Sequence, residues 1–112
     1  MSQNYTSVLS MPLKLTGTVS EYTFVDLSGA TATAALYAFG LADQGGVAGD
    51  LIKTINLGTG RMKAGAAIAK GSPIEVGASG QGVTKVSGIT VARAMEAAVG
   101  AGSVIEVLLL PS

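Results

Sequence analysis

Residues 58–65, GTGRMKAG, have the residue types that come closest to a phosphate-binding loop. Such a loop follows a strand, opens a helix, and has Lys-Ser or Lys-Thr after its last glycine. Here Lys63 is followed by Ala64 and Gly65, and glycine-rich, strand-like sequence continues beyond them. We therefore interpret residues 58–65 as a β-turn that carries two basic side chains.

The seven Asp and Glu residues are the other candidates for chemistry. No two of them have the spacing of a recognisable catalytic motif, and the chain has no histidine to act as a general base or metal ligand. Asp43 and Asp50, which flank QGGVAG, supply too few oxygen ligands for calcium. Cysteine is also absent, which excludes disulfides and thiol chemistry. We expect no enzyme activity, no metal and no cofactor.

The composition favours a protein that covers its surface by assembly. Only 12% of the residues are charged, against roughly 25% in typical globular domains. A chain of so low a charge, with 16 glycines, is poorly protected against association. No stretch reaches the ~18 apolar residues that span a bilayer, and the N-terminus does not resemble a signal peptide. We expect synthesis in the cytoplasm and no membrane partner.

The charges are unevenly distributed. Residues 1–50 contain one base and four acids, whereas residues 51–112 contain six bases and three acids. The bases are either a solvated face or a patch that docks on an acidic protein surface. Nucleic acid is not an expected partner, because the bases are scattered and few aromatic side chains are available for stacking. As docking candidates we take Lys53, Arg61 and Lys63.

Short β-branched and apolar runs between glycines predict a mainly β fold. We expect a small β-barrel or sandwich of short Gly-punctuated strands, with at most one or two short helices and an extended N-terminal arm. Residues 30–43 fit either a helix or a strand, and residues 92–98 are the best short helix candidate. The expected strands lie within residues 14–29 (strand, turn, strand) and at 51–60, 66–69, 73–77, 83–87, 89–95 and 104–110.

Residues 1–12 are polar and lack clear periodicity, and Pro12 disfavours helix just before it. We expect an extended arm over 1–12, followed by a single β-rich domain over 13–112. The alternative is that the arm is an edge strand of the same domain. An arm could bind by adding a strand to a partner's sheet edge, with Tyr5, Val8 and Leu9 as candidate contacts.

The last strand is apolar on both faces. Side chains alternate along a strand, so residues 105, 107 and 109 point one way and residues 104, 106, 108 and 110 the other. One face can cover the core, and the other needs more of this chain or another chain. We take Leu109 as a candidate interface residue.

A weak internal repeat appears at an offset of 53 residues, where residues 38–57 align with residues 91–110 without a gap. Ala48-Gly49 then matches Ala101-Gly102, and Asp43 meets Glu96. The match reflects either a repeated structural unit or chance similarity in an Ala/Gly-rich chain. Because Lys53 and Glu106 fall at equivalent positions, we consider a cross-strand ion pair between them.

Residues 38–110 resemble the small capsid decoration, or cement, proteins of tailed bacteriophages. Those sequences commonly show an element AG..I..G..V and then an ending G.A.E.A..AG..I.V.L. The first 37 residues carry no part of the resemblance. Its residues here are Ala64-Gly65, Ile68, Gly71 and Ile74, then Gly88, Ala92, Glu96, Ala101-Gly102 and Ile105 to Leu110.

The resemblance implies a structural virion protein without enzymatic activity, on the outer surface of a capsid. Its partners would be the major capsid protein, whose neighbouring subunits it bridges, and other copies of itself, with a homotrimer favoured over a dimer. Two alternatives remain. One is another virion component, such as a tail or head-fibre base protein, and the other is a small ligand-binding β-module.

Overall fold

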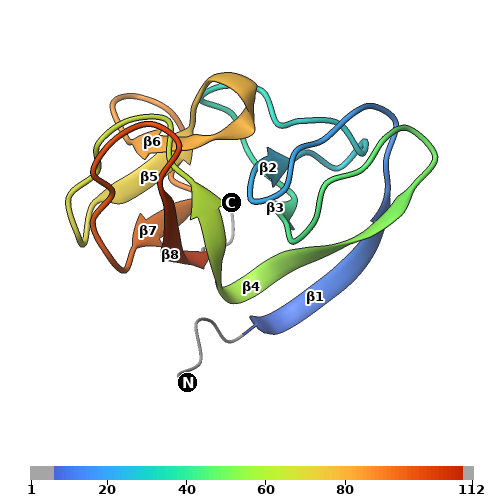
Figure 1. Ribbon diagram of the computed structural model, residues 1–112, viewed down its shortest axis with the longest axis horizontal. Coiled ribbons are helices and arrows are strands. Elements are labelled where there is room, and N and C mark those ends of the chain that lie inside the picture. Colours follow the sequence, from blue (N-terminus) through green and yellow to red (C-terminus); the bar gives the residue numbers. More distant parts are fainter. Residues whose placement is uncertain (1–6, 110–112) are drawn as a thin grey trace.

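The described part of the chain contains eight antiparallel strands and one short 3-10 helix, joined by turns and loops (Figure 1). The structure is a computed structural model that describes the backbone of residues 7–109 and the side chains of residues 12–109. The strands pair in the order β2-β3-β4-β8-β7-β5-β6, and β1 pairs with β4. The predicted mainly β, barrel-like fold is therefore confirmed. The elements are β1 (Ser7–Lys14), β2 (Phe24–Val25), β3 (Gly40–Ala42), β4 (Leu51–Lys63), β5 (Pro73–Val76), η1 (Ala78–Gly80), β6 (Gly82–Thr84), β7 (Ala92–Ala94) and β8 (Val104–Leu109).

The two helix candidates are not helical. Residues 40–42 form β3, and residues 92–94 form β7. In β7 the two alanines are buried and Arg93 between them is exposed, so the period is two and the small side chains fit a narrow interior. Within residues 7–109, no helix has the length and apolar character to cross a membrane.

Three expected local structures differ in the molecule. Residues 58–63 are not a turn but the second part of β4, because they pair along their whole length with β8. Residues 66–69 contribute only one isolated bridge, between Ile68 and Ala98. The strand expected at 83–87 ends with β6 at Thr84, because the N–H groups of Val86 and Gly88 donate to the Glu75 carboxylate and not to a neighbouring strand.

The same backbone hydrogen bonds occur twice along the chain. The pairing of β1 with the first part of β4 is also repeated, by the pairing of the second part of β4 with β8. We therefore describe two structural repeats, residues 9–57 and residues 58–109, which meet inside β4. Each bond of the first repeat is followed here by its counterpart: Leu15–Asp50 and Ala64–Ser103; Val19–Gly46 and Ile68–Ala98; Tyr22–Ala42 and Gly71–Ala94; Asp43–Lys53 and Met95–Glu106; Thr16–Gly29 and Gly65–Gly82.

Counterparts in β4 and β8 are 53 residues apart, as the sequence repeat predicted. Directly before the turn between Gly46 and Asp50, over residues 42–46, they are 52 residues apart. Asp43 corresponds to Met95 and not to Glu96, because the first repeat is one residue shorter in this turn. Lys53 and Glu106 are equivalent positions, but they are not neighbours. Lys53 lies opposite Pro12, and Glu106 lies opposite Arg61, so the cross-strand ion pair that we considered is wrong.

Each repeat closes into a small barrel at a glycine. The N–H of Thr16 donates to Gly29 O (3.0 Å), and the N–H of Gly65 donates to Gly82 O (2.8 Å). A Cβ at Gly29 would collide with the backbone carbonyl of Lys14, and a Cβ at Gly82 would collide with the side chain of Met62. At each closure the glycine therefore lies so close to the first strand of its repeat, β1 or β4, that no larger residue fits without a shift.

We expect Gly29→Ala to destabilise the protein more than Gly49→Ala. The two glycines have nearly the same φ, +91° and +94°, but a Cβ at Gly49 has no heavy atom within 4 Å. The control therefore carries only the cost of the left-handed backbone, about 1 kcal/mol. The collision with a backbone carbonyl adds about 1–3 kcal/mol at Gly29. Urea unfolding of both variants measures the difference, and equal midpoints would show that the closure tolerates a side chain.

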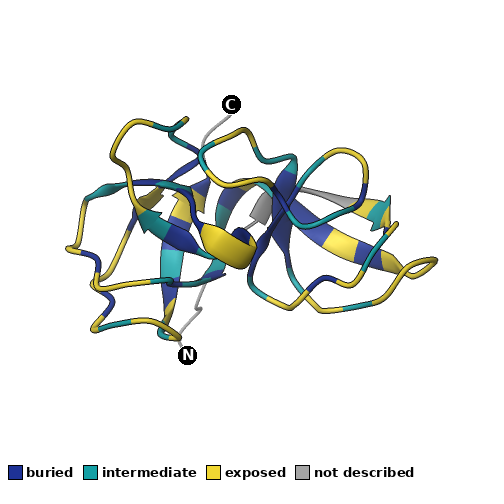
Figure 2. Ribbon diagram, turned by 90° about the horizontal axis from the view of Figure 1, so that it is seen from above, coloured by how far each residue is buried: buried dark blue, intermediate teal, exposed yellow. Residues whose placement is uncertain are grey.

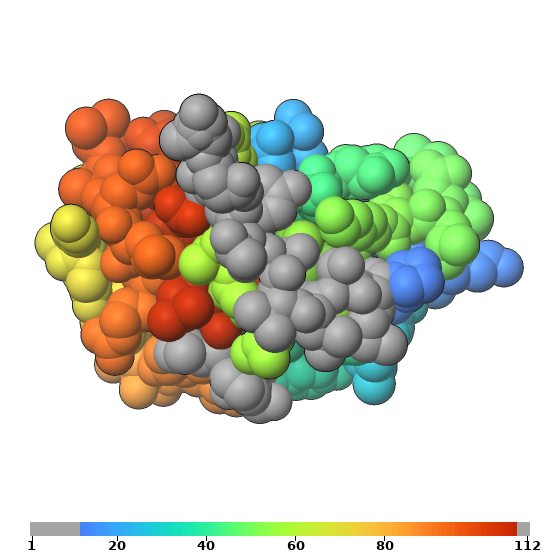
Figure 3. All heavy atoms as spheres, turned by 90° about the horizontal axis from the view of Figure 1, so that it is seen from below, coloured from blue at the N-terminus to red at the C-terminus, as the bar shows by residue number. Residues whose placement is uncertain are grey.

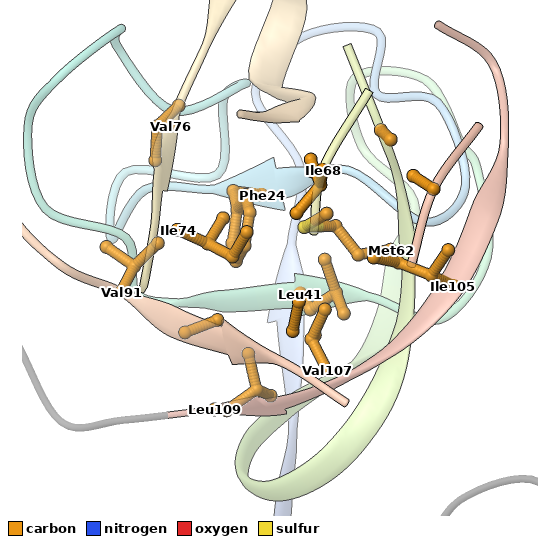
Figure 4. Packing of buried hydrophobic residues seen from close by; sticks show 14 of the residues in the cluster. Phe24, Leu41, Met62, Ile68, Ile74, Val76, Val91, Ile105, Val107 and Leu109 are labelled. Carbon is orange, nitrogen blue, oxygen red and sulfur yellow. The ribbon is translucent and has the colours of Figure 1, made fainter. Parts of the chain in front are cut away.

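The core has two parts (Figures 2 and 4). The first repeat has its own small cluster, and every residue in it has a counterpart in the larger cluster, which fills the second repeat. The larger cluster also takes in Phe24 and Leu41 from the first repeat, which lie among Ile74 and Val107. The second repeat thus packs against one face of the first. The small cluster is Leu15, Val19, Val25, Ala42 and Ile52, and the counterparts are Ala64, Ile68, Ile74, Ala94 and Ile105.

Candidate interaction surface

The contacts predicted for the N-terminal arm lie at the edge of what the structure describes. Tyr5 lies outside the described residues. Val8 and Leu9 belong to β1, where only their backbone is described, and β1 pairs antiparallel with β4. Over residues 7–12 the structure therefore agrees with the edge-strand alternative, and residues 1–6 lie outside the described range.

The three basic candidates all lie on β4, but in different repeats. Lys53 is exposed on the first part of the strand, whereas Arg61 and Lys63 are partly exposed on the second part. Arg61 lies opposite Glu106 and Lys63 opposite Val104 on β8. The structure thus places Arg61 and Lys63 on one sheet face and Lys53 in the other repeat.

Leu109 is a core residue. Its side chain is 4% exposed and packs in the larger cluster with Val107 and Ile105 (Figure 4). The opposite face of β8 holds Val104 and Leu108, which are 41% and 39% exposed. The sequence predicted one face toward the core and one that needs a cover, with Leu109 at the interface, whereas the structure places Leu109 on the core face and Leu108 on the exposed face.

The outward side chains of β4, β8 and β7 form a continuous sheet face, which we call the β8 face. Leu108 lies between its strand neighbours Thr59 and Arg93, and Met95 bonds through its N–H to the Glu106 carbonyl. Red atoms of β8 reach the surface between the green atoms of β4 and the orange atoms that precede β8 in the sequence (Figure 3). The β8 face comprises Arg61, Lys63, Arg93, Met95, Val104, Glu106 and Leu108.

The equivalent face of the first repeat is buried. Leu41 corresponds to Arg93, and Ile55 corresponds to Leu108, because their strands pair in the same way. Leu41 and Ile55 are each 1% exposed and covered by the second repeat, and a Cβ at Gly60 would lie 3.2 Å from Leu41. The β8 face is thus the copy of this surface that has no cover within the described chain.

Four carboxylates hold loops together through backbone N–H groups. Asp26 Oδ1 accepts from Ser28 and Ala30, Asp50 Oδ2 accepts from Val47, Glu75 accepts from two N–H groups, and Glu96 Oε1 accepts from the Glu106 N–H. Each of these four side chains therefore has a structural role. Among the described residues, no three Asp or Glu side chains are grouped as metal ligands would be.

The bonds from the N–H groups of Val86 and Gly88 lower the pKa of Glu75, because they favour its charged form. A lowered folded-state pKa gives stability that is present above the ordinary pKa of Glu, about 4.3, and is lost as pH falls through the folded value. We expect amide exchange of residues 85–88 to accelerate in Glu75→Ala at neutral pH, and wild type to approach the variant in acid. Equal exchange at neutral pH would contradict this role.

The β8 face was only partly visible in the sequence. Arg61 and Lys63 were among the predicted docking residues, and the alternation of β8 separated Leu108 from Leu109, but the sequence led us to take Leu109 as the interface residue. Met95 was not among the predicted contacts, because residues 92–98 had the composition of a helix. The equivalence of Arg93 with a buried leucine leaves no signal in the sequence, since these positions share no residue type.

The comparisons with known proteins show a similarity in structure. No protein-family model matches the chain, and no curated protein matches its sequence. Among solved structures, the chain is similar to the crystal structure of the head fiber gp8.5 N base in bacteriophage phi29, with a TM-score of 0.75 and 19% identity. The match covers 91% of this chain and 93% of the other. At this identity the comparison establishes a shared fold, which extends over both repeats.

Proposed function

We propose that this protein is a structural component of a bacteriophage virion and lies on the outer surface of the head, as the base of a head fibre. The observation that carries the proposal is the fold shared with a phage head fiber base over nearly the whole of both chains. A role as a decoration protein that bridges neighbouring capsid subunits is the second candidate, supported by the sequence resemblance of residues 38–110.

Both roles depend on the area of the contact surface between this protein and its partners, and neither needs catalysis. The partners in this proposal are the major capsid protein and further copies of this chain, with a trimer favoured, and neither nucleic acid nor membrane is involved. Repeated weak contacts over a symmetric shell become strong together through multivalency. The half-exposed apolar side chains of β8 suit such an assembly, because an apolar centre with a polar rim is usual for protein interfaces.

Co-sedimentation with heads of its own virus that lack this protein tests the head location. We expect saturable binding at a fixed ratio to the shell subunit. Isolated tails serve as the control, and binding to tails but not to heads would overturn the proposal. Heads that have bound the protein then separate the two roles. A fibre base should leave the stability of the shell to heat unchanged, whereas a bridging decoration protein should raise it.

A further inference from the structure

We propose that the β8 face docks onto an acidic protein surface of the phage head. This inference rests on the proposed function and names the part of the molecule that makes the contact. It also states the chemistry of the surface that is recognised, namely carboxylate side chains around an apolar spot.

Basic side chains gather on this face in a chain that has few charges. Arg61, Lys63 and Arg93 are three of its seven bases, and Lys85 follows β6 at the next strand, where its N–H bonds to the Pro73 carbonyl. Among the described residues of β4, β7 and β8, Glu106 is the one acid. Arg61 lies opposite Glu106, and Lys85 lies close enough to Glu75 to lower the pKa of that carboxyl, whereas Lys63 and Arg93 lie opposite no acid on their paired strands. The face therefore keeps a net positive charge, and a partner of opposite charge fits it.

At two of these positions, Lys85 and Arg93, the duplication links the basic residue to the uncovered surface. In the first repeat the positions of Lys85 and Arg93 are occupied by Ala32 and Leu41, which are 4% and 1% exposed. The same backbone therefore carries apolar residues where the second repeat covers it and basic residues where the described chain leaves it open. A surface that only had to face water would not need positive charge at both positions.

Apolar side chains lie among the charges of this face, with Val104 and Leu108 on either side of Glu106. Leu108 has Arg93 beside it on β7, and Val104 has Lys63 beside it on β4. Met95 adds a third half-exposed apolar side chain, at 42%. Protein interfaces concentrate their binding energy in an apolar centre and use charges at the rim for orientation and speed of association. The arrangement favours a folded acidic protein over nucleic acid, since no aromatic side chain is on the face to stack on bases.

The charge of the partner can be tested at Leu108 with two variants of similar length, Leu108→Lys and Leu108→Glu. Both remove the apolar contact, and because the side chain is half-exposed both should keep the wild-type melting temperature. We expect Leu108→Glu to bind heads at least about tenfold more weakly than Leu108→Lys. The glutamate would face the carboxylates of the partner with like charge, whereas the lysine would face them with opposite charge. The difference should shrink at 0.5 M salt, where charges are screened.

A second pair of variants tests the basic rim. Lys63→Gln with Lys85→Gln removes two charges from the surface, and Lys14→Gln with Lys53→Gln removes two exposed lysines from the first repeat, where Lys14 is the counterpart of Lys63. We expect the first double variant to bind heads about tenfold more weakly and the second to bind as wild type, because only the first pair of lysines lies on the surface that faces the acidic partner.

The outcomes separate this inference from the proposed function. If the wild-type protein does not bind heads, the proposed function fails. If it binds heads and Leu108→Glu binds as well as Leu108→Lys, the head location stands and the acidic docking surface is wrong. Retention of wild type on duplex DNA, stronger for Leu108→Lys and weaker for Leu108→Glu, would also overturn the inference in favour of a nucleic-acid surface.

Discussion

Leu41→Arg is expected to unfold the protein, whereas the reverse change at the equivalent position, Arg93→Leu, is expected to leave it folded. Leu41 is 1% exposed between the two repeats, so an arginine there would be buried without an opposite charge. Such a charge costs at least about 4 kcal/mol, a large part of the 5–15 kcal/mol that stabilises a typical domain. Arg93 is exposed and donates one hydrogen bond, to Gly71 O at 2.8 Å.

Urea unfolding and near-UV circular dichroism measure both changes. For Arg93→Leu we expect a loss below about 1 kcal/mol, because a bond at the surface is replaced by bonds to water. The same variant should bind heads more weakly, since it removes one charge from the β8 face. A stable Leu41→Arg protein would mean that the two repeats do not pack on each other through this residue.

Leu109→Asp is expected to prevent folding, and Leu108→Asp is expected to give a folded protein. The two residues are neighbours on β8, but Leu109 is 4% exposed and Leu108 is 39% exposed. A carboxylate buried among Val107 and Ile105 has no partner to compensate for its lost hydration, which costs at least about 4 kcal/mol. At Leu108 the carboxylate stays in water.

Proteolysis and size-exclusion chromatography compare these two variants. Leu109→Asp should be cleaved rapidly and elute as an expanded or aggregated species, and Leu108→Asp should behave as wild type in both respects. A compact, resistant Leu109→Asp protein that had merely lost its oligomeric state would return Leu109 to the interface, as the sequence first indicated.

The strand content was predictable because alternation and glycine spacing act locally. β4 and β5 were found close to their observed bounds, and the period of two placed Leu109 and Leu108 on opposite faces of β8, although it did not tell which face is buried. Helix at 92–98 was wrong because alanine fits a helix and a narrow barrel interior equally well in composition. The pairing of β8, and not the local sequence, decides between them.

The candidate surface was less predictable because it depends on how two repeats pack. The sequence shows a repeat of 20 residues, whereas the hydrogen bonds show one that begins at residue 9 and runs to residue 109. Counterparts such as Leu15 and Ala64 both fill a core, yet they share neither size nor shape. The packing of the two repeats decides which copy of the outer face is covered. It therefore explains why Leu41 is buried and its counterpart Arg93 is exposed.

The division of β4 between the repeats has a consequence for the order in which the molecule is made. During synthesis, all strands of the first repeat leave the ribosome before those of the second, so this barrel can close while the rest is still being translated. Its outer face, with Phe24, Leu41 and Ile55, then stays exposed to water until the second repeat folds over it. In that interval the second half of a neighbouring nascent chain fits the same face. A higher concentration of nascent chains is therefore expected to favour exchange of halves between copies.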